Sequence, residues 1–412
     1  MARRKFVVSL AALCLALAIA ALAGLGTGAG KAAARGKQLS GTVTLFGWTT
    51  GTTEDNLLRE VIKGFQKKYP KIKVDYTAFG GDYDQTMLAK FSARQPPDLF
   101  YVNGHVFPVW VPQGVLASLT PYIKKFHFSP KPFYPRLLNG FKYKGKQYGF
   151  PKDWSPLAMY VNTDMLAKAG AKVPTTWTQL RSTAQKLKNS NAVPGGTPIC
   201  LSDDWARLFA FVYQNGYNGR IMSSRSMSTA AVRSAATFYT GLWKSGLAKR
   251  PPDIGASWNG EGFAQGKCAI AFEGSWMLPT VKQATNIHYR VAPLPKNKTR
   301  GNLAFSVSYS IAKDAKHKLL GWTLLTYLTG KVGMRRWVSL TGGLPSRSDV
   351  KPKAGSAVFA NAASYSHVWQ GGSKFNDVIT VANNELSAVA EGKTSVNSML
   401  SKIKTAAKDA GQ

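Results

Sequence analysis

Hydrophobic and polar positions over residues 41–102 switch between the period of a strand and that of a helix. Three stretches have the apolar or alternating pattern of strands: residues 41–47, 71–77 and 99–102. Two stretches between them place apolar residues on one helical face: residues 55–69 and 83–93. The order strand, helix, strand, helix, strand predicts a parallel sheet covered by helices. Ligands bind such sheets beyond the carboxyl ends of the strands, which here are the loops at residues 48–53 and 103–105.

A second block with the same mixture of patterns follows. A threonine cap predicts that a helix starts within residues 175–180. Further helices are predicted at residues 207–213, 229–245, 260–265, 319–328 and 332–339. Extended segments are predicted at residues 199–201, 268–272, 287–294 and 303–311. The last sixty residues have helical periodicity, so the chain is predicted to contain two βα blocks.

Residues 148–164 lie between the two blocks. Pro151 and Pro156 fix the backbone angle φ and cannot donate hydrogen bonds within a sheet. This favours an extended crossing between two lobes, with a ligand cleft beside it. A proline-rich loop inside one domain fits the stretch equally well when it is considered alone. The flanking βα blocks favour the hinge.

The composition is that of a globular protein with an unusually large positive charge. The 412 residues suffice for two domains, and 44% of them are hydrophobic. Lys and Arg number 54 against 20 Asp and Glu, which gives a formal net charge of +34. The basic residues are scattered and belong to no nucleic-acid-binding motif, so we expect no nucleic-acid partner. An anionic cell envelope, an acidic exterior and an anionic substrate all remain compatible with the charge.

The N-terminus has the pattern of a secretory signal peptide. Residues 3–5 are basic, and residues 6–23 are almost entirely apolar and end in the small-x-small sequence Ala-Leu-Ala. We predict a signal peptide over residues 1–23 and a flexible tether over residues 24–39. An uncleaved membrane anchor is the alternative, because the apolar run is about long enough to span a bilayer. Export would place the protein in the periplasm or on the outer face of the cytoplasmic membrane.

Export would leave Cys200 and Cys268 in an oxidising compartment. The two cysteines fit one disulfide or two buried thiols, and their spacing does not distinguish these arrangements. Neither cysteine has a neighbouring histidine, and the five histidines show no ligand spacing. We therefore expect no metal site and no cofactor.

Tryptophans at loops and element ends are the strongest sign of a binding site. Trp and Tyr faces stack on sugar rings, while neighbouring polar groups hydrogen-bond the hydroxyls. Any single Trp can instead fill the core. The candidates for ligand contact are Trp48, Trp154, Trp205, Trp276 and Trp369. The residues that we interpret mainly as core are Trp110, Trp177, Trp243, Trp258, Trp322 and Trp337.

Acidic residues are rare in this chain, which draws attention to two short clusters, Asp203-Asp204-Trp205 and Asp82-Tyr83-Asp84. Each cluster can cap the helix that follows it or accept hydrogen bonds from ligand hydroxyls, and one residue can do both. His105 is a candidate contact or an ordinary buried or surface histidine. No Gly-x-Ser-x-Gly, His-Glu-x-x-His or P-loop motif occurs. We expect a binding protein. The alternative of another class is an exported glycoside hydrolase, which needs a pair of catalytic carboxylates, but no motif marks such a pair.

Several phrases occur in order between residues 41 and 350: VTLFGW at 43–48, FQKKYPKIKV at 65–74, PDL at 97–99, YKGKQYGFP at 143–151, FAQGKCAI at 263–270 and GGLPS at 342–346. Together they resemble the extracellular solute-binding proteins of ABC importers, the family that includes maltose-binding protein. The resemblance implies an α/β, two-lobed type II periplasmic-binding-protein fold. Each lobe would be a mainly parallel sheet flanked by helices. The implied lobes are residues 40–150 with about 306–335, and residues 151–305 with about 336–412.

The resemblance also implies a ligand cleft and a membrane partner. A monomeric receptor would bind a carbohydrate, or an anionic solute such as a glycerol phosphate or a uronate, and deliver it to an ABC permease. The positions that match ligand-binding positions are Trp48, Thr49, Asp82, Tyr83, Asn103, His105, Trp154, Asp204, Trp205, Trp276, Tyr309 and Trp369. The chain lacks the lipid-anchoring cysteine of many Gram-positive members and is far more basic than usual, so the envelope type stays open.

Overall fold

The computed structural model describes residues 39–49, 51–372 and 374–411. The predicted signal peptide, residues 1–23, lies outside these ranges, and so does the predicted tether except for residue 39. No helix within the described ranges is both long and apolar enough to cross a membrane.

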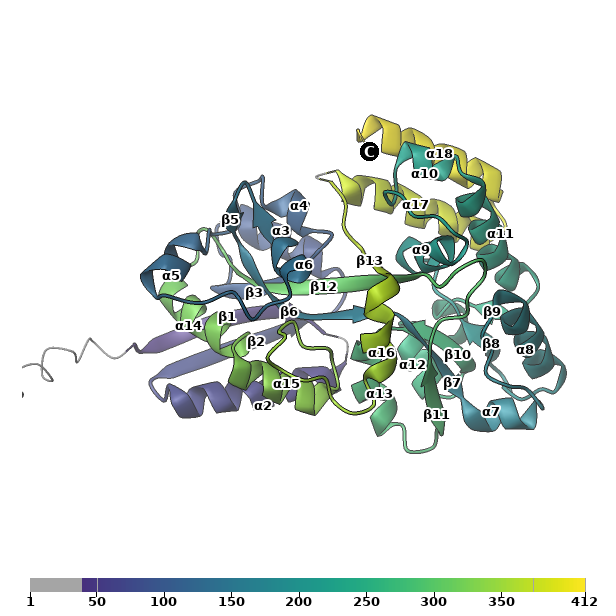
Figure 1. The fold of residues 1–412 in the computed structure, drawn as a ribbon, viewed down its shortest axis with the longest axis horizontal. Helices are drawn as coiled ribbons and strands as arrows, with labels where there is room; N and C mark the ends of the chain where they lie inside the picture. Colours follow the sequence, from purple (N-terminus) through teal and green to yellow (C-terminus); the bar gives the residue numbers. More distant parts are fainter. Residues whose placement is uncertain (1–38, 50, 373, 412) are drawn as a thin grey trace, which may run out of the picture.

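The βα pattern at the start of the chain forms the sheet of the first of two lobes (Figure 1). β1 (Gly41–Trp48) pairs in parallel with β2 (Ile72–Phe79) and β3 (Leu99–Asn103), as the sequence predicts. α2 (Thr52–Lys68) connects β1 to β2. It buries the apolar face predicted from its periodicity, Leu58, Val61, Ile62 and Phe65.

The rest of the first lobe surrounds this sheet. Its other elements are α3 (Tyr83–Ser92), α4 (Phe107–Trp110), α5 (Thr120–Lys125), α6 (Pro135–Asn139), the hairpin of β4 (Lys142–Tyr143) and β5 (Lys146–Gln147), α14 (Lys318–Leu328) and α15 (Lys331–Thr341). The sheet is completed by β6 (Gly149–Pro156), β12 (Asn302–Ile311) and β13 (Ser366–Val368). Its order is β13-β12-β3-β1-β2, with β6 also paired to β12.

The second lobe has a sheet of its own. Its strands are β7 (Ala158–Asn162), β8 (Thr197–Cys200), β9 (Ala248–Lys249), β10 (Cys268–Glu273) and β11 (Tyr289–Ala292), in the order β11-β7-β10-β8-β9. β8, β9 and β10 are parallel, whereas β7 is antiparallel to β10 and β11. The helices are α7 (Thr163–Lys168), α8 (Trp177–Asn189), α9 (Trp205–Gln214), α10 (Ser224–Met227), α11 (Ala230–Lys244), α12 (Asn259–Ala264), α13 (Leu278–Gln283), α17 (Phe375–Ala390) and α18 (Val396–Asp409).

Two strands run side by side between the lobes, β6 and β12 (Figure 1). They are antiparallel, and their register shifts between Val307 and Ser308. β12 is the only strand paired with β6 among the described strands. Pro151 and Pro156 therefore lie on an edge strand, where a residue without a backbone N–H is tolerated. The stretch predicted as a hinge forms β6 and then β7, which belongs to the second sheet.

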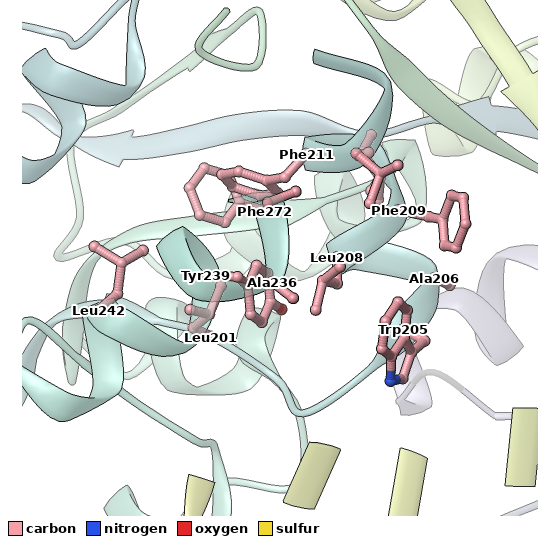
Figure 2. Packing of buried hydrophobic residues seen from close by; sticks show 14 of the residues in the cluster. Leu201, Trp205, Ala206, Leu208, Phe209, Phe211, Ala236, Tyr239, Leu242 and Phe272 are labelled. Carbon is pink, nitrogen blue, oxygen red and sulfur yellow. The ribbon is translucent and has the colours of Figure 1, made fainter. Parts of the chain in front are cut away.

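Each lobe has its own hydrophobic core. Aromatic rings fill the core of the second lobe (Figure 2). The ring centroid of Phe211 lies 5.5 Å from that of Phe272 and 5.4 Å from that of Tyr239, both edge to face. Burying a side chain of this size contributes about 2–3 kcal/mol to folding. Two independent cores allow the lobes to move against each other as units.

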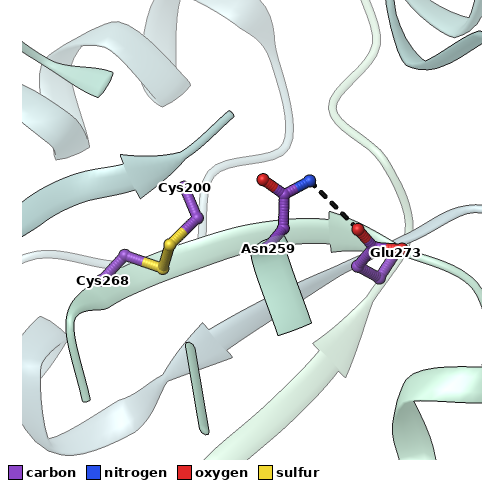
Figure 3. Close-up of a disulfide and its surroundings, with 4 residues drawn as sticks. All are labelled: Cys200, Asn259, Cys268 and Glu273. Carbon is purple, nitrogen blue, oxygen red and sulfur yellow. Dashed lines mark hydrogen bonds between the residues drawn. A yellow bond between two sulfur atoms is a disulfide. The ribbon is translucent and has the colours of Figure 1, made fainter. Parts of the chain in front are cut away.

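Cys200 at the end of β8 and Cys268 at the start of β10 form a disulfide, with their Cα atoms 5.6 Å apart (Figure 3). The bridge therefore links two neighbouring strands of the second sheet. Gly262 of α12 leaves room for the bridge, because a Cβ at this position would lie only 2.9 Å from Cys200 Sγ. The spacing of the cysteines left a disulfide and two buried thiols open, and the structure contains the disulfide.

α15 extends beyond the lobe boundary that we expected at about residue 335. Its Trp337 and Val338 are buried in the first core, because the apolar face of α15 packs against α2. The chain leaves the first lobe only after this helix. It then forms α16 (Ala357–Ala362) and β13 along the hinge before α17 packs on the second lobe (Figure 1).

Candidate functional site

A cavity of about 440 Å³ lies between the two lobes, beside the crossing strands. Phe305 and Val307 of β12 line it. The predicted ligand-binding residues that line it are Trp48, Thr49, Asp82, Tyr83, Asn103, His105, Trp154 and Trp276. We call this cavity the cleft. The loops after β1 and β3 reach it, as expected for the carboxyl ends of parallel strands.

The turn after β10 supplies Trp276 to the cleft. The strand ends at Glu273, which is completely buried, and Gly274 follows it. A Cβ at Gly274 would lie 2.1 Å from the Trp276 ring, so only glycine lets the indole fold back over this turn. The indole N–H donates to Glu273 Oε2 at 2.9 Å. The ring meets Phe305 edge to face at 5.4 Å between centroids.

Arg207, in the first turn of α9, lies behind Trp276 and reaches the cleft. Its Nη2 donates to both oxygens of Glu273 at 2.7 Å, and its Nη1 is bound to Asp204. Glu273 also accepts a hydrogen bond from Asn259 at 3.0 Å (Figure 3). Burial lowers the pKa of Arg207, but Glu273 and Asp204 raise it above its usual value, so the guanidinium stays charged.

A second cation, Lys152 of β6, lies on the other side of the cleft. Its side chain is 5% exposed, and its ammonium lies 2.6 Å from Asp153 Oδ2 and 3.4 Å from Glu54 Oε1. The same Asp153 oxygen accepts the indole N–H of Trp337 at 3.1 Å. The ammonium lies 4.0 Å from the centroid of the Trp337 ring, which is the geometry of a cation–π contact. Burial alone would lower the pKa of Lys152, but Asp153 and Glu54 raise it.

The loop after β1 and the start of α3 form the outer part of the first wall. The Trp48 ring meets Tyr83 and Tyr101 edge to face at 5.4 and 5.0 Å. The Tyr83 hydroxyl donates to backbone oxygens of β1 and β3, and the Thr49 hydroxyl donates to Asp55 at 2.7 Å. These two hydroxyls therefore serve the fold, while the Trp48 indole remains open to the cleft.

Asp82 and Asp84 lie at the N-terminus of α3. Oδ1 of Asp82 caps the helix by accepting from the Gln85 backbone at 3.0 Å. Neither carboxylate forms an ion pair within the described part of the chain. Burial, helped by the nearby charge of Asp82, raises the pKa of Asp84 to about 6. The first wall thus has two carboxylates that are not paired with a cation among the residues that the structure describes.

Asn103 ends β3, His105 follows it, and both line the cleft. Burial lowers the pKa of His105 to about 4, although Asp204 across the cleft opposes the shift. The imidazole is therefore neutral near pH 7. At the rim, Thr53 Oγ1 of α2 donates to Gln283 Oε1 of α13 at 2.7 Å and joins the lobes directly.

Trp154 stands in β6 and has two neighbouring cavities. It lines the cleft on one side and an apolar cavity of about 290 Å³ behind the hinge on the other. Its indole N–H donates to the Pro345 backbone oxygen at 3.1 Å, which fixes the ring to the segment after α15. Trp154 thus packs the hinge and also faces the cleft.

The structure does not bring four of the predicted residues to the cleft lining. Trp205 is 0% exposed and packs against Phe209 in the second core. Trp369 packs between Phe209 and Phe375 in the same core. Tyr309 packs against Tyr101 inside the first lobe. Asp204 lies just behind the lining, where it caps α9 and pairs with Arg207. The residue types fit a ligand site, but the side chains of the three aromatic residues point inward.

Sequence reasoning missed the charged and aromatic residues that connect these elements. Those that line the cleft are Glu54, Lys152, Asp153, Arg207, Phe305 and Trp337. Only Lys152-Asp153-Trp154 gave a local signal, because two opposite charges adjoin a tryptophan within the predicted hinge. No cluster of three or more metal-ligating side chains occurs in the ranges that the structure describes.

Comparison with known proteins places this architecture in a wide group of binding proteins. The family model for bacterial extracellular solute-binding proteins matches residues 60–366, well over half of the chain. An arabinooligosaccharide-binding protein of Bacillus subtilis is 24% identical over 341 residues, which cover 77% of each chain. An sn-glycerol-3-phosphate-binding periplasmic protein of Rhizobium meliloti is 25% identical over 277 residues, which cover 63% of each chain.

A solved structure has the same fold over nearly the whole described chain. An ABC substrate-binding protein of Listeria monocytogenes, in complex with cycloalternan, superposes with a TM-score of 0.81. The match covers 90% of this chain and 100% of the other, at 22% identity. This likeness confirms the predicted two-lobed fold.

Proposed function

This chain belongs to the family of bacterial extracellular solute-binding proteins, and on this premise we propose that it binds a carbohydrate in the cleft. The observation that carries the proposal is the cleft lining. Indole rings of Trp48 and Trp276 stand on opposite lobes, and polar groups stand between them. Stacking on sugar rings and hydrogen bonding to hydroxyls require this combination.

The two crossing strands support a hinge mechanism. β6 and β12 join lobes that have separate cores, so the lobes can close on a ligand by a small change at the strands. The protein would work outside the cytoplasm as a monomer and present the closed form to the permease of an ABC importer. Its large positive charge favours attraction to an anionic cell envelope.

Replacement of Trp276 tests the carbohydrate site. A thermal-shift screen against mono- and oligosaccharides, sugar phosphates and polyols first identifies solutes that bind the folded state. We expect Trp276→Ala to weaken binding of each such saccharide by at least about 30-fold in calorimetry, as for the loss of an aromatic hot spot. Tm without a solute should change little, because the indole is only half-buried.

Trp276→Phe is the matched control for the Ala variant. It keeps an aromatic face but loses the N–H that Glu273 accepts, so its affinity should lie between those of wild type and Trp276→Ala. Unchanged saccharide affinity in Trp276→Ala would refute the site assignment.

A second candidate function is binding of an anionic solute such as a glycerol phosphate or a uronate. Lys152 and Arg207 both line the cleft, and a relative at 25% identity is named for sn-glycerol 3-phosphate. The same screen separates the two classes, because sugar phosphates and uronates would then give the largest shifts.

We also propose that the protein catalyses no reaction on its ligand. Asp153, which lines the cleft, and Glu273, which is buried directly behind it, are committed to cations and indole N–H groups. An oligosaccharide incubated with the protein should be recovered intact by chromatography. Release of shorter sugars, lost on mutation of one carboxylate, would instead indicate an exported glycoside hydrolase.

A further inference from the structure

Two carboxylates have the same kinds of contact: Asp153 of the hinge strand β6 lines the cleft, and Glu273 of the second lobe is buried directly behind it. Asp153 accepts the indole N–H of Trp337 and binds the ammonium of Lys152. Glu273 accepts the indole N–H of Trp276 and binds the guanidinium of Arg207. We call each set of carboxylate, cation and indole a triad. Lys152-Asp153-Trp337 is the hinge triad and Arg207-Glu273-Trp276 is the second-lobe triad.

We infer that Asp153 and Glu273 are positioning residues that set the charge of the ligand: each holds one indole of the cleft by its edge and neutralises the cation beside it, so that the cleft accepts an uncharged saccharide and discriminates against anionic solutes. This inference rests on the proposed carbohydrate function and adds the residues that decide between its two ligand classes.

The indole contacts give the first part of the argument. A hydrogen bond at Nε1 lies in the ring plane, so it fixes the ring without covering either face. In the second-lobe triad the acceptor is itself fixed, because Glu273 is completely buried and also binds Arg207 and Asn259. In the hinge triad the Lys152 ammonium lies over the Trp337 ring at 4.0 Å. Both rings are therefore held in place before a ligand arrives.

The ion pairs give the second part. Lys152 contacts the carboxylates of Asp153 and Glu54, and Arg207 contacts those of Glu273 and Asp204. Each cation thus meets two opposite charges within 4 Å. The pair at the start of α3, Asp82 and Asp84, adds two carboxylates that form no ion pair among the described residues.

The sum of these charges is opposite to that of the chain. Six of the 20 acidic residues meet at or directly behind the cleft lining, against two cations there. The neutral His105 adds no positive charge at pH 7. The whole chain has a net charge of +34. An anionic solute is attracted to the protein as a whole but would meet a surplus of carboxylates inside the cleft, where charges interact more strongly than in water.

Matched pairs of solutes test this inference by calorimetry. Glucose, galactose, maltotriose and cellotriose are each compared with the uronic acid that has the same ring and linkage, and glycerol is compared with sn-glycerol 3-phosphate. We expect wild-type protein to bind the neutral saccharide at least tenfold more tightly than its uronic acid wherever binding is measurable. Glycerol 3-phosphate should show no binding.

Charge-neutral variants of the two carboxylates provide the second arm. Glu273→Gln leaves Arg207 with Asp204 alone, so the ratio of uronate to neutral affinity should rise at least tenfold. Asp153→Asn should act in the same direction, and its partly exposed side chain makes folding less dependent on it. Glu261→Gln on α12, whose carboxylate bonds Ser257 outside the cleft, is the control and should leave the ratio unchanged. A loss of packing would weaken both members of a pair and leave the ratio constant.

The outcomes separate the inference from the proposed function. Equal or tighter binding of a uronate or of glycerol 3-phosphate by wild-type protein overturns the inference and leaves solute binding intact. A ratio that stays constant in folded Asp153→Asn or Glu273→Gln overturns it as well. If both variants fail to fold, the wild-type ratio decides. Absence of binding by any saccharide overturns the proposed carbohydrate function and the inference with it.

Discussion

The two walls of the cleft are built in different ways. The second lobe contributes two short pieces of chain, the start of α9 and the turn after β10. The first lobe contributes the loops after β1 and β3, the starts of α2 and α3 and the end of α15, joined by the hinge strand β6. The second wall therefore depends on the packing of two segments, whereas the first exists only once several distant segments have packed together.

The two walls also differ in how many of their carboxylates form ion pairs. On the second wall, Glu273 and Asp204 both bind Arg207. On the first wall, Asp153 and Glu54 bind Lys152, but Asp82 and Asp84 remain without an ion pair in the described ranges. The comparison indicates a second wall that is internally satisfied and a first wall that keeps acceptors for a ligand.

The largest predicted effect is a loss of stability of the second lobe when Trp205 is replaced. We expect Trp205→Ala to lower the free energy of unfolding by about 3–5 kcal/mol, because the side chain is completely buried beside the start of α9. Urea unfolding followed by circular dichroism measures the loss. The cavity left behind would loosen the helix that carries Arg207.

Trp205→Phe is the matched control for that cavity. It retains most of the buried aromatic volume and should cost much less stability than the Ala variant. Loss of saccharide affinity in Trp205→Phe, at unchanged stability, would show direct ligand contact and contradict the assignment of Trp205 to the core.

Reduction of the disulfide tests whether the second wall depends on its covalent brace. The bridge between Cys200 and Cys268 closes a loop of 68 residues inside the second lobe. Losing such a constraint costs about 2–4 kcal/mol. Differential scanning calorimetry should show a lower Tm with dithiothreitol for wild-type protein. The Cys200→Ala/Cys268→Ala double variant should be insensitive to it. Full thiol labelling with an unchanged Tm would contradict this expectation.

Much of the fold could be predicted because its signals are local. The apolar face of α2 and the alternation in β2 follow from the periodicity of a few neighbouring residues. The loops after β1 and β3 reach the cleft because parallel strands end at the same edge. Pro151 and Pro156 marked β6, which pairs with β12 alone among the described strands. The end of α15 was less predictable, since its packing on α2 depends on a helix far away in the sequence.

The tryptophans show where local signals stop. Trp205 and Trp276 both follow an acidic residue closely at the start of an element, yet one fills the core and the other faces the cleft. Trp337 was expected in the core; it is 5% exposed and still lines the cleft, because Asp153 holds its edge. The direction in which an indole points depends on packing between distant segments, so it cannot be predicted from the neighbouring sequence.

The smallest predicted effect concerns the unpaired carboxylates of the first wall. Burial and the charge of Asp82 raise the pKa of Asp84 in the folded protein to about 6, whereas the unfolded chain should have the ordinary value near 4. Between these values the folded state binds a proton that the unfolded state does not, so this residue makes stability fall as the pH rises from about 4 to 6.

Asp84→Asn removes this titration and should therefore have a higher Tm than wild type at pH 7.5, with the advantage shrinking toward pH 4. Thermal unfolding across this range, without a ligand, measures the difference. Asp82→Asn keeps a capping side chain but removes the neighbouring charge, so it should move the window to lower pH. A Tm difference that does not vary with pH would show that Asp84 is already stabilised within the lobe, and the contrast between a satisfied second wall and an unsatisfied first wall would then be lost.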